Sequence, residues 1–361
     1  MEMEAETKTK TPIKTHLALL FNSLILTIGQ VGGPMLLRIY FTHGGQKRWL
    51  AAWTNTAGFP ILLIPIALAP RRRQLGLPRR LFISCVLLGF LVGFVCYLYA
   101  YGAAYLPVSV HSLISSSQLV FTAVSAYLVV RQKFTPYSVN AVVLMTLGSA
   151  ALGLHMEKDV PEGETLRKYV LGFCMTVGAA CFHGLFLTLV EYAQAKAKAG
   201  GVAVNFDVAM QVQFVILVAA TFFCTVPMIV NRDFQTMSKE AAEFGLGKTN
   251  YYLVVFLAVV ALQLNIIGVL GVVMTSSSLF AGILSSLLVP VQQVFAVIFL
   301  REGFSAEKGM ALALCLWGFA SHLYGGYKAT LARKQQDQEE DPEPEVNRIE
   351  TLLDKHDNNH V

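Results

Sequence analysis

The side chains most able to bind a polar ligand form a stripe within one long apolar run, residues 107–130: His111, Ser115, Gln118 and Thr122. Their spacing of three or four residues places them on one face of a helix. An imidazole can take up and release a proton near neutral pH, and an amide offers both donors and acceptors. The stripe predicts either the lining of a cavity or a helix contact, because hydroxyl-bearing residues also serve close packing between helices.

A second polar stripe occupies the apolar run 277–300 and consists of Ser278, Gly282, Ser285 and Gln292. A buried amide needs several hydrogen-bond partners. We therefore expect Gln118 and Gln292 to face a cavity that the two helices share.

Polar and aromatic side chains elsewhere in the apolar runs complete the predicted site. Amides and hydroxyls would read the edge of a neutral heteroaromatic ring, and Tyr97 would stack on its face. His111 and His183 are candidates for proton coupling, although each could equally be a neutral histidine held by hydrogen bonds. The predicted substrate-binding residues are Asn55, Tyr97, Ser115, Gln118, Gln211, Ser278 and Gln292.

The elements that carry these side chains are predicted to be membrane-spanning helices. The chain has 361 residues, of which 55% are hydrophobic and only 14% charged, whereas a soluble domain is about 25% charged. A spanning helix needs about 20 mostly apolar residues. The composition predicts an all-α polytopic membrane protein with ten spans, at 17–41, 49–69, 81–103, 107–130, 137–155, 169–191, 208–230, 251–273, 277–300 and 309–328.

Two halves of the chain are similar to each other. A shift of 170 residues superimposes Ser115 on Ser285, Arg131 on Arg301 and Gly148 on Gly318. An odd number of spans in each half gives the halves opposite orientations in the membrane, and such inverted repeats place a substrate site between them near the midplane. The predicted units are a cytoplasmic N-terminal segment (1–16), two five-helix repeats (17–155 and 169–328), an extracytoplasmic loop (156–168) and a disordered acidic cytoplasmic tail (329–361).

Loop charges predict the orientation of the chain. Lysine and arginine favour cytoplasmic loops, and the loop RRRQLGLPRR (71–80) is the most basic. If this loop is cytoplasmic, both termini are cytoplasmic as well.

Several classes of function are disfavoured. An enzyme would need paired intramembrane carboxylates, a metal cluster or a nucleophile with its base, and no such pattern occurs, so we predict no enzyme activity, cofactor or metal. The six cysteines show no C-x-x-C spacing. A channel would need a charged pore-lining ring, and nucleic-acid binding would need a basic face. The expected partners are a small heteroaromatic substrate, protons and the lipid bilayer.

Three blocks of sequence resemble the plant purine permease family, within the drug/metabolite transporter superfamily. They are GQVGGPMLLRIYFTHGG (29–45) with TAGFPILLIP (56–65), then LYAYGAAYLPVSVHSLISSSQLVFTAVSAYLVVRQKFTPYSVNAVVLMTLG (98–148), and GVLGVVMTSSSLFAGILSSLLVPVQQVFAVIFLREGFS (268–305). The resemblance implies a ten-helix inverted-repeat carrier in the plasma membrane, which takes up purine bases, cytokinins and related heteroaromatics together with protons. Some members of the family take up alkaloids or vitamin B6-type compounds instead.

At two places the chain departs from the family pattern. The family has an acid just before TAG and another before Met-Gln in the seventh span, where this chain has Asn55 and Ala209. Two interpretations follow. Either a histidine carries the coupling proton, or the selectivity has moved from adenine toward the alkaloid or vitamin B6-type ligands.

Overall fold

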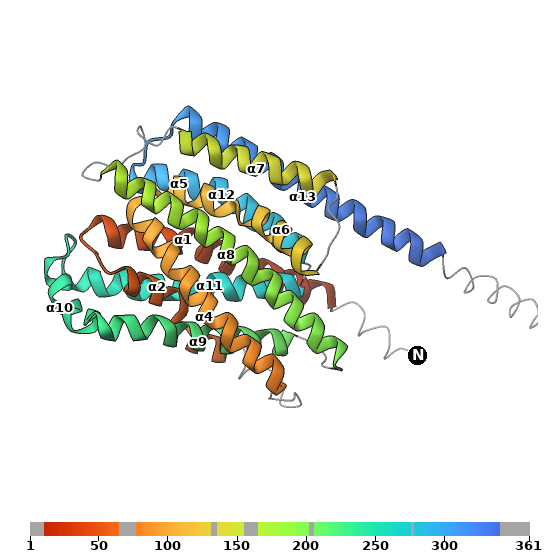
Figure 1. The fold of residues 1–361 in the computed structure, drawn as a ribbon, viewed down its shortest axis with the longest axis horizontal. Coiled ribbons are helices and arrows are strands. Elements are labelled where there is room, and N and C mark those ends of the chain that lie inside the picture. The colour runs from red at the N-terminus through yellow and green to blue at the C-terminus, as the bar shows by residue number, and fades with distance from the viewer. Residues whose placement is uncertain are drawn as a thin grey trace, which may run out of the picture.

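The computed structural model describes residues 11–64, 77–130, 136–154, 165–201, 206–275 and 278–339, and every regular element within these ranges is a helix (Figure 1). The first half contains α1 (Thr11–Thr42), α2 (Arg48–Thr56), the 3₁₀ helix η1 (Phe59–Leu62), α4 (Arg79–Tyr105), α5 (Val108–Ser116), α6 (Gln118–Val130) and α7 (Pro136–Leu154). The second half contains α8 (Leu166–Ala199), α9 (Phe206–Val230), α10 (Asp233–Glu243), α11 (Lys248–Thr275), α12 (Ser278–Leu300) and α13 (Ala306–Glu339).

Helix length and hydropathy agree with a polytopic membrane protein. Within the described ranges, 6 stretches are long and apolar enough to cross a bilayer: His16–Thr42, Arg79–Tyr105, Val108–Val129, Leu166–Ala199, Val208–Val230 and Lys248–Val272. Shorter apolar helical stretches, Val139–Gly148 and Val291–Leu300, fall inside two further predicted spans. Large apolar side chains such as Phe256 and Trp317 are exposed on the outside of the bundle, as a lipid-facing surface requires.

The predicted span 49–69 is interrupted after a short helix. The segment α2 ends at Thr56 and is followed by η1, in which Pro60 occupies one of the first positions. Proline has no N–H to continue an α-helix. The backbone of the first half is therefore irregular beside Asn55, one of the predicted site residues.

The predicted span 107–130 is divided into α5 and α6 at Ser117. The hydroxyls of Ser115, Ser116 and Ser117 donate to the carbonyls of His111, Leu113 and Ile114 at 2.7, 2.6 and 2.6 Å. Such bonds compete with the helix ladder and bend it. The run of serines explains the break and places His111 and Gln118 on either side of it.

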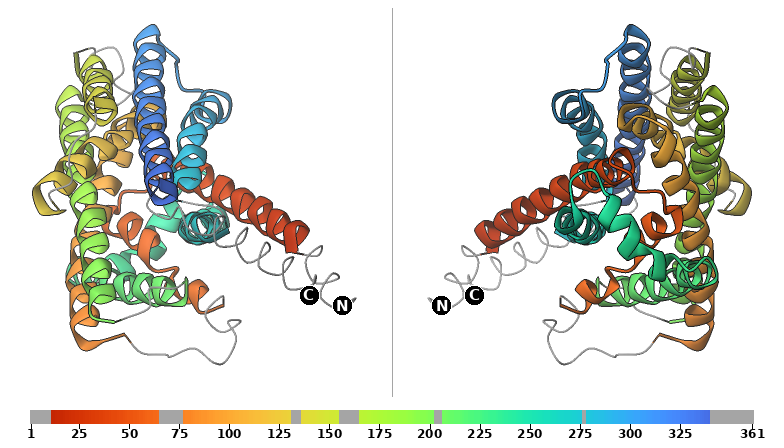
Figure 2. Two further views of the ribbon diagram at one scale, coloured as in Figure 1. Left: turned by 90° about the vertical axis from the view of Figure 1, so that its right-hand side faces the viewer. Right: turned by 90° about the vertical axis from the view of Figure 1, so that its left-hand side faces the viewer.

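The helices form several layers (Figures 1 and 2). The pair α7 and α13 lies at one side of the molecule and α9 at the other, with α5, α6 and α12 near the first pair. Contacts between the halves join α1 to α11, α4 to both α8 and α9, α6 to α8, α1 to α12, α2 to α9, α5 to α12 and α7 to α13. Small residues allow close approach: a Cβ on Gly29 of α1 would stand 2.6 Å from the Ala261 carbonyl oxygen of α11.

The outermost predicted units lie partly outside the described residues. Helix α1 begins at Thr11, within the segment expected to precede the first span, and 1–10 are not described. Helix α13 continues to Glu339, so the beginning of the tail predicted to be disordered is helical, whereas 340–361 are not described. Most of the loop 156–168 is likewise outside the described ranges. The start of α1 and the end of α13 lie at the same end of the bundle (Figure 1).

Candidate functional site

The two histidines predicted to couple protons meet at one aromatic ring. Tyr99 of α4 has its ring centroid 5.7 Å from that of His111 on α5 and 6.0 Å from that of His183 on α8, and both contacts are edge-to-face. His183 also stacks on Phe186 at 5.7 Å. Nε2 of His111 and Nδ1 of His183 are buried and have no hydrogen-bond partner among the described residues. Three helices thus enclose two imidazoles, each with an unpaired nitrogen.

Gly102 allows α4, α5 and α8 to approach one another at this cluster. A Cβ at this position would overlap the Thr176 hydroxyl and stand 3.2 Å from Cδ2 of His111. The Thr176 hydroxyl donates to the carbonyl of Gly172, one turn earlier in α8, at 2.8 Å. The contact of α4 with α8 therefore depends on a residue without a side chain, because the Thr176 hydroxyl bonds within its own helix.

The polar stripe of 107–130 faces α4 and α8 instead of α12. His111 contacts Tyr99 and Gly102 on α4. Further along, the Thr188 hydroxyl of α8 donates to the carbonyl of Thr122 at 3.4 Å. Ser115 uses its hydroxyl within its own helix, and Gln118 is half-buried at the start of α6. The stripe predicted in 107–130 is therefore not the surface through which α5 contacts α12.

A different set of residues joins α5 to α12. The side-chain amide of Gln293 donates to the Ser109 carbonyl at 2.9 Å and to the Ser112 hydroxyl at 2.8 Å. Gln292, the predicted residue, is also buried but points in another direction, since successive helical residues differ by about 100°. Gln292 and Gln293 are adjacent in the sequence, and only Gln292 belongs to the predicted stripe.

Asn55 lies where α2 ends. The side-chain amide of Asn55 donates to the main-chain carbonyl of Ala51 at 3.0 Å. The main-chain carbonyl of Asn55 accepts a bond from the side-chain amide of Gln263, on α11, at 3.1 Å. Gln263 is fully buried, and its Oε1 has no partner within the described chain. It fits against Gly58, where a Cβ would overlap its Cγ. Gln263 satisfies a carbonyl that the end of α2 leaves unpaired, a role that sequence analysis missed.

Tyr97 belongs to an aromatic cluster at the end of α4. Its ring stacks on Trp49 of α2 with centroids 3.9 Å apart and an interplanar angle of 21°. The Arg48 guanidinium lies over the rings of Tyr101 and Tyr105, at 4.4 and 5.2 Å from their centroids, and also donates to the Tyr105 hydroxyl. One face of the Tyr97 ring is covered by tryptophan, and Tyr101 contacts it at 6.3 Å between centroids.

Two other predicted residues, Gln211 and Ser278, share no interaction with the residues around Tyr97 or Tyr99 in the described ranges. Gln211 is half-buried on α9 between Met210 and Val212, and Ser278 is the first residue of α12. The structure thus brings Ser115, His111 and His183 together near Tyr99.

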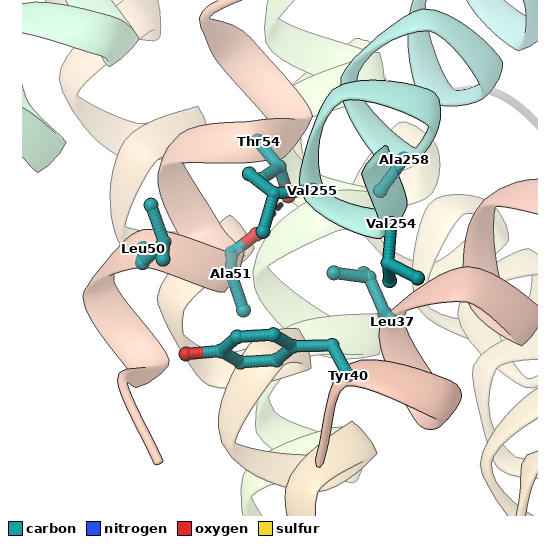
Figure 3. Close-up of a pocket in the computed structure, with 8 residues that line it drawn as sticks. All are labelled: Leu37, Tyr40, Leu50, Ala51, Thr54, Val254, Val255 and Ala258. Atoms are coloured by element: carbon teal, nitrogen blue, oxygen red, sulfur yellow. Dashed lines mark hydrogen bonds between the residues drawn. The ribbon is translucent and has the colours of Figure 1, made fainter. Parts of the chain in front are cut away.

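In the described part of the chain, hollows between helices include two that are lined mainly by apolar side chains. One of about 10 Å³ lies among α1, α2 and α11, where Tyr40, Leu50 and Val254 pack closely (Figure 3). The other, of about 380 Å³, lies between α4 and α9 and is lined by apolar side chains, including the exposed Phe82, Phe90 and Phe222. Its chemistry suits lipid chains rather than a purine. No three histidine, cysteine or acidic side chains gather as a metal site would require, in the part of the chain described.

An all-helical bundle with several apolar spans, helix breaks and unpaired polar atoms in its interior is typical of a membrane transporter. Comparison with known proteins gives the family. A family model for purine nucleobase transmembrane transport matches residues 17–332. Purine permease 3 of Arabidopsis thaliana is 41% identical over 337 residues, covering 90% of this chain and 95% of the relative. Purine permease 2 of the same plant is 40% identical over 347 residues, covering 90% and 96%.

The chain therefore belongs to the purine permease family, as the sequence resemblance predicted. Probable purine permease 5 of Arabidopsis thaliana, which is 33% identical over 317 residues, matches 87% of this chain and 87% of its own length. The relatives are named permeases, so the chain is a multi-pass membrane transporter and not an enzyme.

Proposed function

We propose that the chain is a secondary active transporter that takes up purine bases, cytokinins or related heteroaromatics together with protons, by alternating access. Family membership supports the purine class of substrate. The structural observation that carries the proposal is the Tyr99 ring between His111 and His183, because it places two proton acceptors inside a membrane bundle next to a broken helix.

The proposed architecture is a ten-helix inverted repeat. The helix contacts support it, because most of the extensive contacts recur when α1, α2, α4, α5 with α6, and α7 are exchanged with α8, α9, α11, α12 and α13, respectively. Under this exchange α1 with α11 becomes α8 with α4, and α6 with α8 becomes α12 with α1. The pairs α2 with α9, α5 with α12 and α7 with α13 exchange with themselves. The units proposed are the repeats 17–155 and 169–328, with the loop 156–168 between them.

The proposed substrate site lies near the two breaks, at Asn55 and at Ser117. Its amides and hydroxyls would bind the donors and acceptors on the edge of a ring, and the Tyr97 ring would stack on it. Half-helix ends beside a substrate site are usual in inverted-repeat carriers. We propose as substrate-binding residues Asn55, Tyr97, Ser115, Gln118, Gln211, Ser278 and Gln292.

The proposed location is the plasma membrane with both termini in the cytoplasm. The basic loop 71–80 would then be cytoplasmic. The position of the start of α1 and the end of α13 at one end of the bundle supports an even number of crossings (Figure 1).

A second candidate function is uptake of alkaloids or vitamin B6-type compounds by the same fold. Asn55 and Ala209 stand where the family pattern has acids, and this favours it. Both candidates are tested by radiolabelled adenine uptake in yeast at two external pH values, with unlabelled cytokinin, an alkaloid and pyridoxine as competitors. Saturable uptake that is faster at acid pH and competed by cytokinin supports the first candidate. No adenine uptake despite verified surface protein, with uptake of the alkaloid or pyridoxine, supports the second.

A further inference from the structure

An apolar groove of about 380 Å³ lies between α4 and α9. Its walls are phenylalanines from both helices, Phe82 and Phe90 on α4 and Phe214 and Phe222 on α9. Phe82 is 47% exposed and Phe222 is 64% exposed. The groove therefore opens toward the lipid around the bundle and not toward its interior.

Small residues between α4 and α9 allow the two helices to approach each other beneath this groove. A Cβ on Gly89 would stand 2.5 Å from both the Cβ of Ala219 and the carbonyl oxygen of Ile216. Ala219 lines the groove and is buried, whereas the phenylalanine rings project on either side of it. The stretch from Phe82 to Phe90 is about 12 Å long at the helical rise. A narrow apolar groove of this length suits a hydrocarbon chain, which gains dispersion contacts with both walls.

One end of the groove carries an arginine in line with its lining. Arg79 precedes Phe82 and Val86 by three and seven residues, so all three lie on one face of α4. Arg79 and its neighbour Arg80 are both exposed. A guanidinium pairs with phosphate through two parallel hydrogen bonds. A phosphate bound by Arg79 would therefore lie at the entrance to the apolar groove.

The helices α4 and α9 begin at the same end of the bundle. A Cβ on Gly89 would meet Ala219, and a Cβ on Gly93 would meet the ring of Phe223. Both sequence positions increase together, so the two helices run in the same direction. The end of α8 lies there as well, because Ala197 packs in the same apolar cluster as Leu77.

Basic residues exceed acidic ones at this end. The loop 71–80 contains five arginines and no acidic residue. The exposed Lys196 and Lys198 lie in the last turn of α8. The acidic residues nearest to them in sequence are Glu191 and Asp207. The basic end of the groove thus complements an anionic headgroup.

We propose that the groove is a binding site for an anionic glycerophospholipid, with its phosphate held by Arg79 and Arg80 and one acyl chain lying between α4 and α9. The apolar groove alone would accept any lipid, and the arginines alone would accept any anion. Their alignment selects a phosphate joined to a hydrocarbon chain. In the proposed orientation this end lies in the cytoplasmic leaflet, where anionic lipids attract basic residues. The site involves no transported substrate and is independent of the proposed function.

The test is photolabelling of the full-length protein in phosphatidylcholine proteoliposomes. A trace of phosphatidylserine with a diazirine in its acyl chain is the probe, and phosphatidylcholine with the same chain is the reference. Labelled peptides are identified by mass spectrometry. At equal mole fraction, phosphatidylserine should label 82–90 and 214–222 roughly thirtyfold more than the reference, the combined effect of two arginines on an anionic headgroup. Both probes should label the exposed surface around Trp317 equally.

Two substitutions separate the headgroup contact from general charge. Arg79→Gln combined with Arg80→Gln should reduce the labelling by phosphatidylserine to the level of the reference. Lys239→Gln combined with Lys248→Gln removes the same charge from exposed positions beyond the other end of α9, and should leave the preference unchanged. A preference that survives the double arginine substitution would overturn the proposal.

A further pair of variants tests the acyl-chain contact. Val218→Trp fills the groove and should lower the labelling of 82–90 by both probes. Val226→Trp is the matched control, because Val226 is exposed on the same helix but does not line the groove. Equal loss of labelling in the two variants would contradict the assignment of the chain to this groove.

The wild-type protein provides a test that requires no variant to fold. Exposed charges are screened by salt, so the preference for phosphatidylserine should fall between about 0.05 and about 0.5 M salt. Equal labelling by the two probes at low salt would mean that the groove holds only ordinary boundary lipid, which would overturn the proposal. Absence of label from either probe, together with a disulfide between two copies carrying Phe222→Cys, would show that a second copy covers the groove and would also overturn it.

Discussion

Substitution of Gly58 by alanine should destabilise the protein through a single steric conflict. The backbone of Gly58, with φ of −75° and ψ of 3°, is open to any L-residue, so the conformation itself carries no penalty. A Cβ there would overlap Cγ of Gln263 and stand 2.8 Å from its Cδ. Gln263 is fully buried and can move only by giving up its bond to the Asn55 carbonyl. Overpacking together with the lost hydrogen bond should cost about 2–4 kcal/mol.

The free energy of unfolding is measured by titration with a denaturing detergent in mixed micelles. Gly32→Ala is the matched control, because a Cβ on Gly32 of α1 would meet only Ala261 Cβ, at 3.9 Å. This control should be neutral or slightly stabilising, since alanine favours a helix. In a Gln263→Ala background the cost of Gly58→Ala should nearly vanish, which is the coupling expected of residues in contact. Equal stability of Gly58→Ala and Gly32→Ala, or an undiminished cost in the Gln263→Ala background, would refute the reasoning.

Three further predictions concern the site. His183→Gln should lower adenine uptake and flatten its pH profile, because it removes one of the two imidazoles at Tyr99; an unchanged profile at equal surface expression would exclude His183 from proton coupling. Gln293→Met should cost about 1–3 kcal/mol of stability in the same detergent titration, because it removes two buried hydrogen bonds, whereas a neutral effect would mean that water replaces them. Trp49→Leu should raise KM with little change in maximal rate, since Tyr97 loses the ring that orients it; a fall in maximal rate alone would argue against a role of Tyr97 in binding.

Much of the fold could be predicted from hydropathy, and the helix breaks could not. Long apolar runs predict helices because the bilayer requires them to satisfy their own backbone groups. The division at Ser117 depends on three hydroxyls that bond to carbonyls of the preceding turn, and a window of apolar residues does not register it. The interruption of 49–69 follows from Pro60, which has no N–H to continue an α-helix, and a hydropathy window does not register it either.

The site was harder to predict, because α5 carries polar residues on more than one of its faces. Serines stand at 109, 112, 115, 116 and 117, so a helical wheel supports more than one polar face. Periodicity selected the face that contains His111 and Ser115, whereas the contact with α12 uses the other one. Tyr99 was overlooked since tyrosines near the end of a span usually belong to the membrane interface. Only the position of α8 shows that this tyrosine joins the two histidines.

The short length of α5 has a mechanical consequence. Pro107 precedes it and the break at Ser117 follows it, so the regular α-helical bonding pattern is interrupted on both sides. Its neighbours are then what holds it. On one side these are the Glu302 carboxylate, which accepts the Val108 N–H, and the Gln293 amide, which donates to Ser109 and Ser112. On the other side His111 rests on a ring that also contacts His183. The proposed proton acceptors and the polar bonds that hold α5 thus lie on opposite sides of one short helix.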